Sequence, residues 1–123
     1  MTSLYPRVAD AMPAIMQDFY DRLFDDIMIG FFFAGRDKAE LIDKQLAFMS
    51  AAMGGPEAYR GRSLKAAHAP LRIFEGQFAR RHQVLRETLD DHGLAPEDRD
   101  AWLALDASFR DRILASEPCH DHE

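Results

Sequence analysis

The chain has 123 residues, of which 47% are hydrophobic and 29% are charged, a balance that fits one globular domain and not a disordered chain. Its 21 acidic and 15 basic residues give a formal net charge of −6, and no basic cluster is long enough to follow a phosphate backbone, so nucleic acid is not an expected partner. The longest apolar run, Ile27 to Gly35, has about half of the roughly 20 residues that a transmembrane helix needs, which argues against a membrane span.

The cysteine content and the two ends of the chain favour a reducing compartment. Cys119 is the one cysteine, so it has no partner for an intramolecular disulfide. The first residues lack a basic segment followed by an apolar core of signal-peptide length. We therefore expect a cytoplasmic monomer. The tail from about residue 117 to 123 contains Cys119, His120 and His122, but a short exposed tail has no scaffold, so we expect disorder and no native metal site there.

A first long helix is expected from Asp10, a good N-cap residue, with Pro13 in the first turn, where its missing N–H costs little. Its apolar residues recur at three- and four-residue steps, which predicts a helix packed on one side. These residues are Met12, Ile15, Met16, Phe19, Leu23 and Ile27. Tyr20 lies at the edge of this stripe. Three consecutive phenylalanines, Phe31 to Phe33, cannot share one helical face, so they predict a tight corner with at least one ring facing a cavity or a neighbour.

A second helix is expected after Asp37, where Glu40 follows at the spacing of a capping box. Gly54-Gly55-Pro56 predicts its end. Its apolar face consists of Leu41, Gln45, Phe48, Met49, Ala52 and Met53. Gln45 is thus a polar residue at a core position, where a buried amide needs hydrogen-bond partners. A hydrogen bond within ordinary helix packing would satisfy it as well as a ligand would.

Three further helices complete an all-α chain. A very short helix is expected between Ser63 and Pro70, with His68 near its end, where an imidazole could bind a metal or simply be satisfied by a backbone carbonyl. The next helix, from residue 74 to 92, is expected to bury Phe78, Leu85 and Leu89, with Arg81 and His82 on or beside this stripe and Gly93 as its stop. The last helix begins near Pro96, and its expected buried residues are Trp102, Leu105, Phe109 and Ile113.

A pocket between helices with one candidate imidazole ligand suits haem. Haem needs an axial nitrogen, which His68 can supply, an apolar surround, and cations or phenols near its propionates. The candidates for the propionates are Tyr59, Arg62, Lys65 and Arg72. Each of these could equally be an ordinary surface residue.

The order and spacing of these segments resemble a truncated haemoglobin, most closely group I, over roughly Met12 to Leu114. The resemblance implies one domain over residues 1–123, a two-over-two helical sandwich around one haem b. In this family the match to His68 is the proximal iron ligand, and the matches to Tyr20 and Gln45 hold the distal ligand. The match to Phe33 packs against the haem. Further expected haem-pocket residues are Phe32, Leu41, Lys44, Phe48, Met53, Tyr59, Leu64, Lys65, Arg72, Ile73 and Phe78.

The resemblance also implies reversible binding of O2, NO and CO. Several members convert NO and bound oxygen to nitrate, so nitric oxide dioxygenase activity is one expectation, and it requires a separate reductase because this chain has no flavin or nicotinamide domain. A gas carrier or sensor without turnover is the alternative. A helical interaction domain without a cofactor is a third class, and such a protein would be colourless.

The chain departs from the family pattern at three places. It lacks the usual Gly-Gly pair before the first long helix, so the first helix is expected to be vestigial. Arg81 matches a position that is normally apolar and near the distal pocket. Lys44 matches a position where some relatives carry a histidine or lysine that binds iron itself. The alternative for Lys44 is an ammonium group directed to solvent or to a haem propionate.

Overall fold

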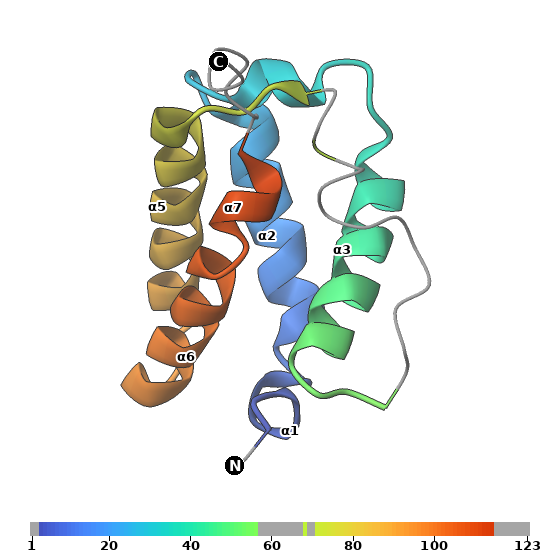
Figure 1. Cartoon of the computed structure of the whole chain (residues 1–123). Coiled ribbons are helices and arrows are strands. Elements are labelled where there is room, and N and C mark those ends of the chain that lie inside the picture. The colour runs from blue at the N-terminus through green and yellow to red at the C-terminus, as the bar shows by residue number, and fades with distance from the viewer. Residues whose placement is uncertain (1–2, 57–67, 69–70, 115–123) are drawn as a thin grey trace.

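The computed structural model describes residues 3–56, 68 and 71–114, and every regular element in this part of the chain is helical. The elements are α1 (Tyr5–Val8), α2 (Met12–Asp25), the 3-10 helix η1 (Gly30–Phe33), α3 (Lys38–Ala52), α5 (Glu75–Asp91), α6 (Pro96–Ala107) and α7 (Arg110–Ile113). Helix α2 packs against α3 on one side and α5 on the other, and α6 packs along α5 (Figure 1). Two helical pairs, α2 with α3 and α5 with α6, therefore make up the domain.

Helix α2 begins later than expected. The prediction that Asp10 caps it is wrong, because Asp10 is exposed in a turn and the helix follows Ala11, which makes no side-chain cap. The vestigial first helix is the reason: the backbone N–H of Ala9 donates to the carbonyl of Tyr5 and that of Ala11 to Val8, so α1 leads almost directly into α2. Helix α1, four residues long, agrees with the expectation of a vestigial first helix.

Helix α2 also ends earlier than the apolar stripe suggested. The predicted stripe residues Met12, Ile15, Met16, Phe19 and Leu23 are buried. Ile27, however, is 99% exposed, so the prediction that it packs inward is wrong. The carboxylate of Asp26 accepts hydrogen bonds from the N–H groups of Met28 at 2.9 Å and Ile29 at 3.1 Å, which turns the chain out of the helix. Ile29 takes the inward place instead and is 3% exposed.

The two ends of α3 follow the predicted signals. The Asp37 carboxylate accepts the N–H of Glu40 at 3.2 Å, which confirms Asp37 as the N-cap. Beyond Met53, Gly54 has a φ of 91°, the left-handed conformation that glycine adopts at little cost when it ends a helix. The N–H of Tyr5 donates to the carbonyl of Met53 at 3.1 Å, and the Ser3 hydroxyl donates to the same oxygen. These bonds hold α1 at the C-terminal end of α3.

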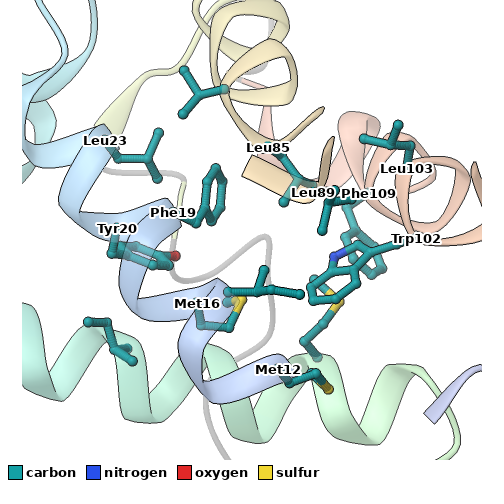
Figure 2. Close-up of a cluster of buried hydrophobic side chains, with 14 of the residues drawn as sticks. Met12, Met16, Phe19, Tyr20, Leu23, Leu85, Leu89, Trp102, Leu103 and Phe109 are labelled. Atoms are coloured by element: carbon teal, nitrogen blue, oxygen red, sulfur yellow. The ribbon is translucent and has the colours of Figure 1, made fainter. Parts of the chain in front are cut away.

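The main core lies where α2, α5 and α6 meet (Figure 2). Met16, Phe19, Leu85, Leu89 and Trp102 are each at most 2% exposed. Burying a large apolar side chain contributes roughly 1.5–3 kcal/mol, so this cluster outweighs any single surface ion pair. The predicted stripe of Phe78, Leu85 and Leu89 on α5 is confirmed.

The final helical segment is divided. Helix α6 ends at Ala107 and α7 begins at Arg110, where a single helix was expected. Phe109 and Ile113 are buried as predicted, whereas Leu105 is only partly buried. Within the described residues, no helix is long and apolar enough to cross a bilayer.

Candidate functional site

Tyr20 on α2 is a buried phenol. Its side chain is 5% exposed, and its ring stands edge-on to Phe19 at 5.4 Å and to Phe33 at 6.1 Å between ring centres. Burial raises the pKa of Tyr20 to about 12, while the charge of Arg81 opposes the increase. The hydroxyl therefore stays protonated and able to donate. In the described part of the chain, no residue forms a hydrogen bond with this hydroxyl.

The corner at η1 places Phe33 against Tyr20. Phe33 also stacks on Phe24, with ring centres 5.0 Å apart and an angle of 25° between the planes. Phe31, by contrast, is 60% exposed and contacts Phe32 at 4.2 Å between ring centres. The prediction that at least one ring of this phenylalanine run faces a neighbour is confirmed at Phe33.

One face of α3 is only half-buried although it is largely apolar. Leu41, Gln45 and Phe48 follow one another at steps of four and three residues, so they share a face of the helix. All three are partly exposed, whereas Ile42, Met49 and Met53 on α3 and just past its end are buried. Since α3 packs against α2, this row and Tyr20 lie on the two members of one helical pair.

The predicted iron ligand, His68, is helical and half-buried. Ile73 and Phe78, expected to line the same pocket, are 9% and 6% exposed. Arg72 is exposed, has a φ of 53°, and places its guanidinium 5.9 Å from the Phe74 ring centre. Tyr59, Arg62, Leu64 and Lys65 lie outside the described residues.

Lys44 lies at the surface. Its side chain is 65% exposed, and its ammonium group is 3.2 Å from a carboxylate oxygen of Glu40, one helical turn away. Such a pair contributes only about 0.3–0.5 kcal/mol, so it restrains the lysine weakly.

A buried charge cluster connects α5 and α6, and the sequence analysis did not foresee it. Nη1 of Arg81 donates to both carboxylate oxygens of Asp106, at 2.7 and 2.9 Å, and Nδ1 of His82 lies 2.8 Å from one of them. Asp106 is completely buried. Burial alone would raise the pKa of Asp106, but the charge of Arg81 and the hydrogen bonds from His82 and Arg81 outweigh it and lower the pKa.

The sequence did contain a signal for this cluster. Trp102, Asp106, Phe109 and Ile113 are spaced four, three and four residues apart, the period of a buried helical stripe, so Asp106 occupies a core position. A carboxylate at a core position requires a cation. Arg81 on the neighbouring helix is that cation.

Known proteins match this chain along almost its whole length. Residues 4–115 match the bacterial-like globin family. The chain belongs to this family. It is 35% identical over 117 residues to the group 1 truncated haemoglobin GlbN of Mycolicibacterium paratuberculosis, covering 94% of this chain and 86% of that protein. It is 31% identical to the group 1 truncated haemoglobin GlbN of a Synechocystis strain, covering 82% of this chain and 69% of that protein.

Solved structures agree on the globin fold. The 2/2 haemoglobin of Synechococcus sp. PCC 7002, determined in the cyanomet state with covalently attached haem, has a TM-score of 0.87 and 26% identity over 92% of this chain and 98% of that one. THB1 of Chlamydomonas reinhardtii has a TM-score of 0.78 and 34% identity over 90% and 95% of the two chains. The prediction of an all-α truncated haemoglobin with a two-over-two helical sandwich is thus confirmed.

Proposed function

We propose that this globin holds one haem b per monomer and uses it to bind O2 reversibly, together with NO and CO. The observation that carries the proposal is the buried Tyr20 hydroxyl, which is neutral, is made rigid by Phe19 and Phe33, and has no partner among the described residues. A phenol held at this position can donate a hydrogen bond to a bound ligand, and such a bond contributes about 1.5–3 kcal/mol when the acceptor carries charge.

The residues present fit a haem. His68 offers an imidazole nitrogen, and the half-buried faces of Phe33, Leu41 and Phe48 offer the apolar surface that a porphyrin requires. When bound, the haem supplies an iron atom that accepts a diatomic gas.

The roles that we propose for the chain's own side chains follow from the family resemblance. His68 would hold the haem through an imidazole nitrogen. Tyr20 would donate its O–H to a bound gas that carries partial negative charge, and the amide of Gln45 on α3 would supply a second donor. The aromatic residues around Tyr20 exclude water, which strengthens these hydrogen bonds.

We propose further that the physiological reaction is the oxidation of nitric oxide, in which NO and O2 combine with one electron to give nitrate. Family membership supports this use. We expect the electron to come from a reductase, because the globin match over residues 4–115 supplies no flavin or nicotinamide cofactor of its own.

Rapid mixing tests this reaction. Oxygen-loaded ferrous protein mixed with one equivalent of NO is expected to give about one equivalent of nitrate and ferric protein within the mixing time, followed by stopped-flow absorbance and nitrate analysis. Slow oxidation without nitrate would favour a carrier or sensor. Protein that takes up no haem and stays colourless would instead support the cofactor-free interaction domain.

We also propose a test for Lys44 as a switchable distal ligand. To bind iron, Lys44 must leave Glu40 and lose its proton, so coordination is expected to increase as the pH rises. We expect ferric wild-type protein to form a low-spin species at alkaline pH that Lys44→Ala does not form, and Glu40→Gln to form it more readily. If all three proteins form the species equally, hydroxide or another residue is the ligand.

A further inference from the structure

Arg81 is a buried cation whose hydrogen-bonding capacity is only partly used. Its side chain is 17% exposed, and Nη1 alone makes both bonds to Asp106. A guanidinium also carries N–H groups on Nε and Nη2. Those groups have no partner in the part of the chain that the structure describes. The remaining donors are therefore available to another acceptor.

The position of this guanidinium is fixed by two aromatic rings. Its central carbon lies 5.3 Å from the ring centre of Phe19 and 5.9 Å from that of Phe78. Phe19 is the edge-on neighbour of Tyr20, and Phe78 is one of the expected pocket residues. Figure 2 shows Phe19 and Tyr20 as consecutive residues of α2, with Leu85 of α5 beyond the Phe19 ring. Arg81 thus borders the region in which Tyr20 is expected to meet a ligand.

Electrostatics favour an anion in this region. Burial raises the pKa of Tyr20, the positive charge of Arg81 lowers it, and the negative charge of Asp106 raises it by less than Arg81 lowers it, so the positive charge of the pair acts more strongly on the phenol. Asp106 compensates the charge of Arg81 from one side only. In a site with little water, a positive charge with free N–H groups attracts anions more strongly than it would in bulk solvent.

We propose that Arg81 is an anion-binding residue on the Tyr20 side of the haem pocket, where its Nε and Nη2 groups take small inorganic anions such as azide, nitrite or nitrate. The proposal rests on the proposed function, because it requires the haem pocket to lie beside Tyr20. Tyr20 and Gln45 are neutral donors, so neither can replace Arg81. The full positive charge of Arg81 discriminates anionic from neutral ligands.

The probe is sodium azide, titrated by absorbance into ferric, haem-loaded protein at constant ionic strength, with CO binding to the ferrous protein as the neutral comparison. Arg81→Met is expected to lower azide affinity roughly ten- to a hundredfold, the range for loss of a charge-assisted hydrogen bond, and to leave CO affinity unchanged. Asp106→Asn removes the compensating negative charge and is expected to raise azide affinity. Arg86→Met, which removes an exposed positive charge from the same helix, serves as the control and is expected to behave as wild type.

Arg81→Met leaves the Asp106 carboxylate buried without its cation and could prevent folding, so the double variant Arg81→Met/Asp106→Asn is measured as well. It is expected to bind azide more weakly than wild type. Wild-type azide affinity in the double variant, or an equal loss of azide and CO affinity, would overturn the proposal, since the second result indicates a structural role. Failure of the wild-type protein to bind haem would instead refute the proposed function itself.

Discussion

Replacing His68 with glycine is expected to abolish stoichiometric haem binding. The substitution removes the imidazole that we assign to the iron, while the aromatic and aliphatic contacts of Phe33, Leu41 and Phe48 persist. Apolar contacts alone hold a porphyrin weakly and in more than one orientation, whereas the axial bond fixes the iron. The measurement is the Soret absorbance per protein after reconstitution with one equivalent of haem and gel filtration.

Two further measurements make this result specific to His68. Added imidazole is expected to restore a Soret band to His68→Gly, because it can occupy the space of the missing side chain and bind the iron. His92→Gln is the matched control, since the Nε2 atom of His92 lies 2.9 Å from Asp18 in a surface ion-pair cluster and should not affect haem content. A wild-type Soret spectrum in His68→Gly without imidazole would refute the assignment of the proximal ligand.

The helices were predictable where apolar residues keep a regular period, and the errors lie at helix ends. The stripe from Met12 to Leu23 identified the buried face of α2 because the period of the side chains reflects the geometry of the helix. The same period suggested Ile27, but the Asp26 carboxylate binds two backbone N–H groups and ends the helix first. The period of the apolar residues does not reveal where a side chain competes with the helix for backbone N–H groups.

The charge cluster escaped prediction for a different reason. Arg81 and Asp106 are 25 residues apart on different helices, so their pairing depends on how α5 and α6 pack. The resemblance places Arg81 at a position that is normally apolar in the family. Only the packed structure shows which carboxylate neutralises its charge. The two charges of the pair act on the Tyr20 phenol in opposite directions, and this part of the candidate site required coordinates.

Tyr20 itself illustrates what the sequence could and could not provide. The stripe placed it at the edge of α2, and the family resemblance suggested a distal donor. Burial raises its pKa to about 12 against the opposing charge of Arg81, and the contacts with Phe33 of η1 and the position of Arg81 on α5 depend on how the helices pack. Burial decides whether a phenol donates to a ligand or to water, so the distal role that the resemblance implies for Tyr20 remains a proposal that ligand-release rates can test.

Removing the distal donors is expected to speed the release of oxygen. Tyr20→Phe keeps the ring between Phe19 and Phe33 and deletes only the hydroxyl, and Gln45→Leu keeps a similar volume on α3. A hydrogen bond to a charged acceptor contributes about 1.5–3 kcal/mol, so each substitution should raise the oxygen dissociation rate roughly ten- to a hundredfold if the bond is already broken in the transition state. Stopped-flow displacement of O2 by CO measures these rates.

The CO dissociation rate provides the internal reference, because CO carries little charge and should respond less to either substitution. Tyr5→Phe on α1 removes a phenol outside the proposed pocket and serves as the control. The oxygen dissociation rate of the wild-type protein is also expected to show no Tyr20-dependent step between neutral pH and about pH 11. The phenol has a pKa of about 12, so it loses its donor proton only as the pH approaches that value. Unchanged oxygen dissociation rates in both variants would show that neither side chain reaches the ligand. A double variant whose rate exceeds the product of the two single effects would instead show that Tyr20 and Gln45 partly replace each other at the same oxygen atom.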